Sequence, residues 1–114
     1  MNVRTLPQSP EQLLDELFVI FPQYRDEYNG PSHDDTPTYH SVLMAFVPFF
    51  GGGIASCSEQ QLRAFGQLVN TAIAQGGPLE NAFSTCLLEH LRQIQAERRF
   101  RPFLSKTALE KTHA

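Results

Sequence analysis

Four histidines, two cysteines and a group of carboxylates are the residues of this 114-residue chain that could carry chemistry. Asp34, Asp35 and His40 lie close enough along the chain to hold a cation together. The zinc pattern His-Glu-x-x-His is absent, and solvated acids beside a helix start give the same local pattern without a metal. We therefore expect no metal site and no cofactor.

The two cysteines offer little for nucleophilic catalysis. Cys57 directly precedes a predicted helix, where the N-terminus can lower the pKa of a thiol, but the sequence places no base beside it. Cys86 lies beside the apolar face of another predicted helix, where a thiol acts as a small hydrophobic group. Gly51-Gly52-Gly53 lacks the Lys-Ser/Thr of a phosphate-binding loop. The chain is therefore predicted not to be an enzyme.

Charge is divided unevenly along the chain. Residues 1–40 hold seven acidic and two basic residues, whereas residues 41–114 hold five acidic and seven basic ones. Two interpretations stay open: the acidic and basic parts form two binding faces, or they pair with each other within the molecule. The net charge of −3 argues against nucleic acid as a partner.

Tyrosines interleave with the acids of the first part of the chain. Tyrosine gives a large contact area at a small entropy cost, so an acidic surface of this kind suits a basic partner protein. The alternative is that the tyrosines surround the core with their hydroxyls in water. The candidate partner-binding residues are Tyr24, Asp26, Glu27, Tyr28, Asp34, Asp35, Tyr39 and His40.

Proline and glycine divide the first half of the chain into helical segments. Ser9-Pro10 is a helix start, apolar residues at three- and four-residue spacing follow it, and Pro22 ends that helix. A short helix is expected over residues 23–29. Thr36-Pro37 starts a third helix, which Pro48 should kink or end, and the glycines after it form a turn with positive φ or a close approach.

The second half repeats this organisation. Ser58-Glu59-Gln60-Gln61 is a capping box, and the helix that it opens has the clearest 3.6-residue periodicity in the chain. Gly76-Gly77 ends that helix. Another is expected from Pro78 to about Arg98, with a weak turn after Ser105.

These segments predict a small all-α bundle of about four main helices plus short helical turns. Residues 1–114 form one domain, with residues 1–8 and 105–114 as flexible termini. No secretory signal is present, and Pro48 with the glycines interrupts the longest apolar run, so we expect a cytoplasmic protein without a membrane partner.

Several residue runs resemble a family of small helical bacterial proteins found with polymorphic toxin and contact-dependent competition systems. The runs are Phe21-Pro22-x-Tyr24, Tyr28-Asn29-Gly30, a helix with Phe46, and above all Leu79-Glu80-Asn81-Ala82-Phe83-Ser84-Thr85-Cys86-Leu87-Leu88-Glu89-His90-Leu91. The resemblance extends from about residue 10 to residue 104. It implies a cytosolic immunity protein, an antitoxin that binds a cognate toxin domain and occludes its active site.

A second hypothesis belongs to a different class of protein. The chain would be a homo-oligomeric helical adaptor, a possible homodimer, that associates through an exposed apolar helix face and has no toxin partner. A third hypothesis is a metal-dependent enzyme built on Asp34, Asp35 and His40.

Overall fold

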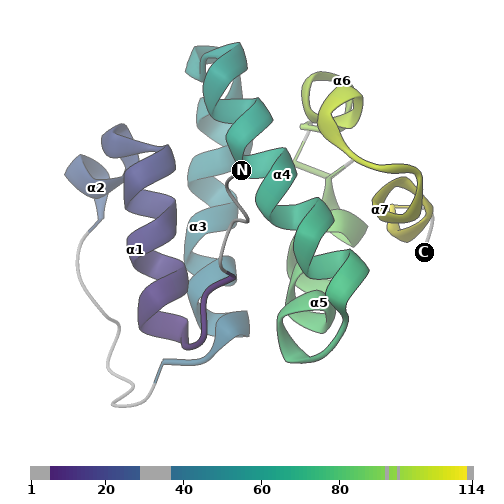
Figure 1. Cartoon of the computed structure of the whole chain (residues 1–114). Coiled ribbons are helices and arrows are strands. Elements are labelled where there is room, and N and C mark those ends of the chain that lie inside the picture. Colours follow the sequence, from purple (N-terminus) through teal and green to yellow (C-terminus); the bar gives the residue numbers. More distant parts are fainter. Residues whose placement is uncertain (1–5, 29–36, 92, 95, 113–114) are drawn as a thin grey trace.

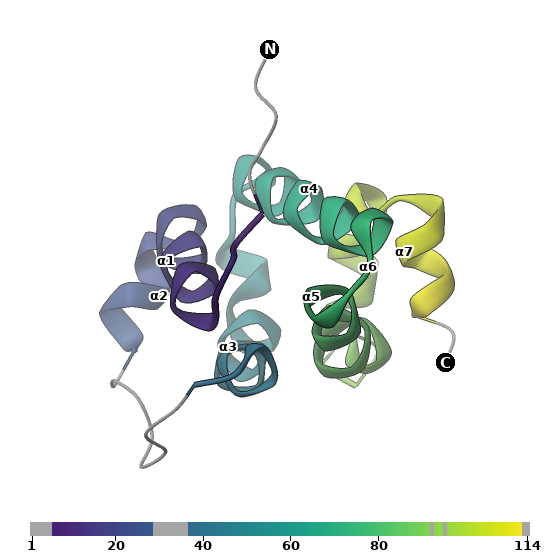
Figure 2. The ribbon, with the colours of Figure 1, turned by 60° about the horizontal axis from the view of Figure 1, so that its bottom comes forward.

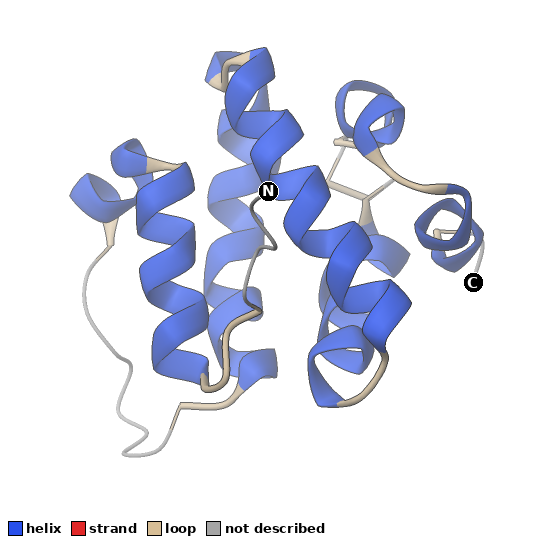
Figure 3. Ribbon diagram, in the orientation of Figure 1, coloured by secondary structure: helices blue, strands red, loops and turns tan. Residues whose placement is uncertain are grey.

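The computed structural model describes residues 6–28, 37–91, 93–94 and 96–112. Every regular element in these ranges is helical, which confirms the predicted all-α class (Figure 3). The elements are α1 (Pro10–Ile20), α2 (Pro22–Glu27), α3 (Tyr39–Gly53), η1 (Ile54–Ser56), α4 (Glu59–Gln75), α5 (Pro78–Ala82), η2 (Phe83–Leu87), η3 (Leu88–His90), α6 (Glu97–Phe100), η4 (Arg101–Phe103) and α7 (Lys106–Lys111).

The helices pack on both sides of α4. Helices α1, α2 and α3 lie together on one side, and α5, α6 and α7 lie on the other (Figures 1 and 2). The apolar row of α4 includes Phe65, Val69 and Ala72, all fully buried, so this helix contributes to the packing of both groups. The N-terminal and C-terminal helices are therefore held at opposite ends of one core.

Phenylalanine dominates that core. The ring of Phe65 lies 5.2–6.1 Å, centroid to centroid, from five other phenylalanine rings. Such edge-on and offset pairs add to the free energy gained by burying the rings. The phenylalanines with no exposed surface are Phe21, Phe46, Phe50, Phe65, Phe83 and Phe100.

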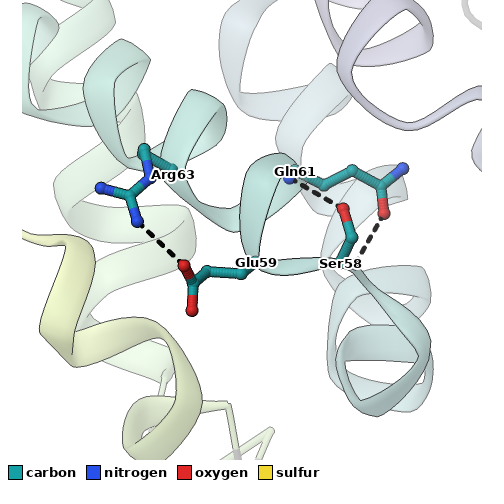
Figure 4. Close-up of polar contacts among 4 residues, drawn as sticks. All are labelled: Ser58, Glu59, Gln61 and Arg63. Carbon is teal, nitrogen blue, oxygen red and sulfur yellow. Dashed lines mark hydrogen bonds and ion pairs between the residues drawn. The ribbon is translucent and has the colours of Figure 1, made fainter.

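The predicted capping box starts α4 as expected. The Ser58 hydroxyl accepts the Gln61 N–H at 3.1 Å, and the Gln61 side chain accepts the Ser58 N–H at 3.0 Å (Figure 4). Arg63 and Glu59 form an exposed ion pair beside it, at 3.0 Å. Helix α3 has the same kind of cap, but its cap is Thr38, which bonds reciprocally with Ser41, instead of Thr36, which lies outside the described residues.

The sequence predicted that Pro48 kinks or ends α3 near Val47. The helix does not end there and continues through Pro48 to Gly53. A proline inside a helix leaves the carbonyl four residues earlier without its N–H partner. Here Pro48 and Met44 are both exposed, so water can reach this part of the helix. Phe46 and Phe50, buried on the opposite side, hold it against the core.

The continuous segment Tyr39–Ser56 is therefore long and apolar enough, by length and composition, to cross a membrane. The expected interruption at Pro48 is absent. The core helix of a globule passes the same test, and one such helix is weak grounds for a membrane span. Among its side chains, Val42, Leu43, Phe46, Phe50 and Ile54 are buried in the core.

The three glycines at the end of α3 are helical and form no turn. Among the described glycines, positive φ occurs at Gly76 and Gly77, which end α4 as predicted. The expected close approach occurs at Gly51, where an added Cβ would lie 2.8 Å from the Cβ of Ile94. Gly51 thus lets the chain after η3 pack directly on α3.

The helix predicted from Pro78 to about Arg98 is not one α-helix. It begins as α5, widens into the π-helix η2 and tightens into η3. Leu79, Phe83, Leu87 and Leu91 recur every four residues, and all are buried. A four-residue repeat exceeds the 3.6-residue turn and drifts around an α-helix, so a wider π turn brings the row back to the core.

The C-terminal segment contains the helical turn that the sequence predicted after Ser105. Residues predicted to form a flexible terminus include α7, which begins at the Ser105 cap and buries Ala108. Asn70 of α4 accepts the Ser105 N–H at 2.8 Å and donates to the Phe103 carbonyl at 3.0 Å. These bonds join α7 to α4.

Candidate functional site

Four exposed carboxylates lie on α1 and α2, and we call them the acidic end: Glu11 and Asp15 on α1, with Asp26 and Glu27 on α2. None of the four makes an ion pair with another residue that the structure describes. The nearby cation, Arg25, lies 5.7 Å from the centre of the Phe18 ring. The described residues of this end therefore carry more negative than positive charge.

Asp26 and Glu27 occupy the last two positions of α2. The C-terminal end of a helix carries partial negative charge, so carboxylates are unfavourable there. The same last turn also holds the exposed cation Arg25, which offsets part of this cost. Two carboxylates beside one cation leave the turn with net negative charge.

The core fixes where α2 points. Phe21, at the corner between α1 and α2, is fully buried. Gln61 of α4 donates to the Ile20 carbonyl at 3.1 Å and to the Gln23 side chain at 2.9 Å. The carbonyl at the end of α1 thus has a partner, and α2 is attached to α4.

Tyr24 does not belong to the exposed face that the sequence predicted. Its side chain is 3% exposed and packs 4.9 Å from the Phe49 ring and 5.2 Å from the Phe46 ring. Tyr24 lies on the inner face of the short helix α2, so its ring is buried and packs α2 against α3. Tyr28 is half-buried, with its ring 5.3 Å from Phe18.

Burial also affects the titration of Tyr24. Its hydroxyl has no hydrogen-bond partner among the described residues, and burial raises its pKa to about 12, with a smaller contribution from Tyr28. The pKa of an unfolded tyrosine is near 10. Between about pH 10 and pH 12 the Tyr24 phenol therefore ionises in the unfolded chain but stays neutral in the folded one. The free energy of unfolding is highest below about pH 10 and falls as the pH rises to about 12.

We predict that Tyr24→Phe removes this alkaline loss. At pH 7 the variant should be equal to the wild type or more stable, by up to ~1 kcal/mol, because a buried hydroxyl without a partner is removed. Urea unfolding of both chains at pH 7 and pH 11 measures the effect. Equal losses in the two chains between these pH values would show that Tyr24 is not the group responsible.

The other predicted residues do not form one patch with α2. Tyr39 and His40 are half-buried in the first turn of α3, whereas α2 packs on Phe46 and Phe49. The helical rise places these two regions roughly 9–15 Å apart along α3. Asp34 and Asp35 lie outside the described residues.

Two features were missed in the sequence. Glu11 and Asp15, four residues apart on α1, add exposed negative charge to the same pair of helices, and their spacing could have shown that they share a face of α1. His40 contacts Cys86 of η2, with 3.1 Å between Nδ1 and Sγ. No sequence signal connects these two residues, which are 46 positions apart.

The structure changes the assessment of Cys57. The thiol is 3% exposed, and burial raises its pKa, although the Arg99 cation acts in the opposite direction. A raised pKa leaves less of the reactive thiolate, so the helix-start activation considered for this residue does not occur. Within the described ranges, no group of three or more potential metal ligands is found.

The opposite end of the molecule is basic. Arg98, Arg101 and Lys106 are exposed, and none pairs with the acidic end. An open pocket of about 580 Å³ lies here between η4 and α7. The pocket is lined by Arg98, Arg101, Pro102, Leu104 and Leu109. Both interpretations of the charge asymmetry, two binding faces or pairing within the molecule, stay open.

Compared with protein-family models, curated proteins and solved structures, the chain matches none of them. The resemblance to toxin-system immunity proteins stays a prediction.

Proposed function

We propose that this chain is a non-enzymatic binding protein, an immunity protein that neutralises a cognate secreted bacterial toxin in the cytoplasm. The acidic end would cover a basic substrate-binding cleft of the toxin domain. The observation that carries this proposal is the set of four exposed carboxylates without ion-pair partners among the described residues. Complementary charge of this kind speeds association and selects the partner.

The architecture of α2 supports the same role. A binding surface should be rigid, because ordering a flexible one upon association costs free energy. Phe21 and Tyr24 anchor α2 in the core, and Gln61 bonds to its first turn. Asp26 and Glu27 are thus presented on a fixed support, with Tyr28 partly exposed beside them.

The alternative is the self-associating adaptor. The large apolar side chains exposed among the described residues are Val19, at 73%, and Met44, at 66%. A homodimer interface needs an extended apolar patch, and two separate side chains provide only a small part of one. We therefore place the immunity function first.

The two functions are separated by isolating the tagged chain from its native cell and identifying the proteins that accompany it. The immunity function predicts one stoichiometric partner that is lethal when expressed alone and harmless when co-expressed with this chain. Recovery of the chain alone, together with a tight dimer in sedimentation, would contradict the immunity function and favour the adaptor.

A further inference from the structure

The Cys86 thiol and the His40 imidazole form a pair that joins the first turn of α3 to the π-helix η2. The Cys86 Sγ lies 3.1 Å from Nδ1 of His40 and forms no disulfide. Both residues are half-buried, so neither is enclosed in the core. A thiol beside an imidazole is the arrangement by which proteins activate a cysteine.

The surroundings of Nδ1 identify the thiol as the group that can donate to it. The Thr85 hydroxyl donates to the Asn81 carbonyl at 2.9 Å, so its proton is directed away from Nδ1, which lies 3.4 Å from the hydroxyl oxygen. With the imidazole proton on Nε2, Nδ1 has a lone pair, and the Cys86 S–H, with its sulfur 3.1 Å away, can donate to it. In that arrangement Nδ1 is a base in direct contact with the thiol proton.

The backbone at Cys86 is also unusual. The π-helix η2 covers Phe83–Leu87, and π turns within helices are frequent at functional sites. In η2 the apolar residues Phe83 and Leu87 are buried while Cys86 remains partly exposed. The turn thus leaves Cys86 partly exposed at the edge of the core, with its sulfur against the start of α3.

We propose that Cys86 is a modification site at which a low-molecular-weight disulfide forms a mixed disulfide with the protein, with His40 as the base. His40 Nδ1 takes the thiol proton, and the Cys86 thiolate attacks one sulfur of the small disulfide. The new sulfur–sulfur bond forms as the old one breaks. The departing thiolate takes the proton back from His40, so the reaction consumes one disulfide and releases one thiol.

Cys57 provides an internal reference in the same chain. It is buried, its thiol donates to the Gly53 carbonyl at 3.4 Å, and burial raises its pKa. The two cysteines are both free thiols and differ in exposure and in their partners. Peptide mapping distinguishes them, so no cysteine needs to be replaced.

The first measurement is the rate of alkylation of each cysteine by iodoacetamide at pH 6, in the folded chain and in the chain unfolded by urea. Only thiolate reacts, so a thiol that has given its proton to His40 reacts faster folded than unfolded. We expect Cys86 to react about tenfold faster in the folded chain, and Cys57 to react more slowly. A folded Cys86 that is no faster than the unfolded one would overturn the proposal, with no variant needed.

The second measurement assigns the base. His40→Asn should lower the rate at Cys86 by about tenfold at pH 6 and by much less at pH 9, where the thiolate forms without help. His90→Asn is the matched control, because His90 is exposed and contacts Gln93 instead of a cysteine. Equal effects of the two variants, or none from His40→Asn, would overturn the role of His40.

The third measurement is the modification itself. Incubation of the folded chain with oxidised glutathione should add one glutathione to the peptide that contains Cys86 and none to the peptide that contains Cys57. Modification of both peptides at the same rate, or of neither, would contradict the proposal. None of these readouts requires the toxin partner, so their outcome is independent of the proposed function.

Discussion

Phe65→Ala is expected to lower the free energy of unfolding by about 3–5 kcal/mol, the largest effect of any single substitution considered for this chain. Phe65 is fully buried, and its ring contacts the rings of Phe21, Phe46, Phe50, Phe83 and Phe100. These rings come from helices on both sides of α4. Truncation leaves a cavity that neither side can fill alone, so the transfer and cavity costs add.

Phe49→Ala serves as the control for Phe65→Ala. Phe49 contacts Phe21, Tyr24 and Phe46, but it is only half-buried. Phe49→Ala removes less buried surface, and the site is open to solvent. It should therefore lower the free energy of unfolding by about half as much as Phe65→Ala, or less. Urea unfolding followed by circular dichroism gives both values. Equal losses would show that Phe65 is not the centre of the core.

Gly66→Ala is expected to destabilise the protein by about 1–3 kcal/mol, although alanine is the better helix former. A Cβ on Gly66 would lie 2.6 Å from the Phe103 carbonyl oxygen and 2.9 Å from the Phe103 Cβ. The same carbonyl accepts a bond from Asn70, so it cannot move away without breaking that bond. The clash is with backbone, which makes it costly.

The matched control is Gly52→Ala, in the last turn of α3. Gly52 is exposed, and an added Cβ meets no atom within 4 Å. Only the helix propensity of the residue then changes, so Gly52→Ala should raise the free energy of unfolding by about 0.5–1 kcal/mol. Opposite signs for the two variants are the expected result. Stabilisation by Gly66→Ala would mean that α4 and η4 are farther apart than the structure places them.

The sequence predicted the elements whose signals are local. The Ser58 capping box, the apolar row of α4 and the Gly76-Gly77 stop all depend on residues within a few positions of one another. The same is true of the start of α1 at Ser9 and its end before Pro22. The all-α class follows from these elements, and it is confirmed.

The predictions that failed are those in which the core overrides a local signal. Pro48 would end an isolated helix, but Phe46 and Phe50 anchor α3 on both sides of it. The four-residue row from Leu79 to Leu91 predicts one α-helix, and burial of that row produces a π turn instead.

The candidate site was predictable only in part. Exposure of Asp26 and Glu27 follows from charge, but burial of Tyr24 depends on rings that come from α3. The contact between His40 and Cys86 joins segments distant in sequence, and only the packing of α3 on η2 creates it. Pairing across a fold has no signature in a single sequence.

The most direct test of the binding function is the rate at which the toxin partner associates with the double variant Asp26→Lys, Glu27→Lys. Reversing both charges should slow association at least about tenfold at low salt and weaken protection of cells. The difference should shrink at high salt, because salt screens exposed charges.

The matched control carries the same charge change at a distance from the acidic end. Glu89→Lys with Glu110→Lys reverses two exposed carboxylates on η3 and α7. This variant should associate nearly as fast as the wild type and still protect cells. Full association and protection by the Asp26→Lys, Glu27→Lys variant at low salt would contradict the claim that the acidic end is the binding face.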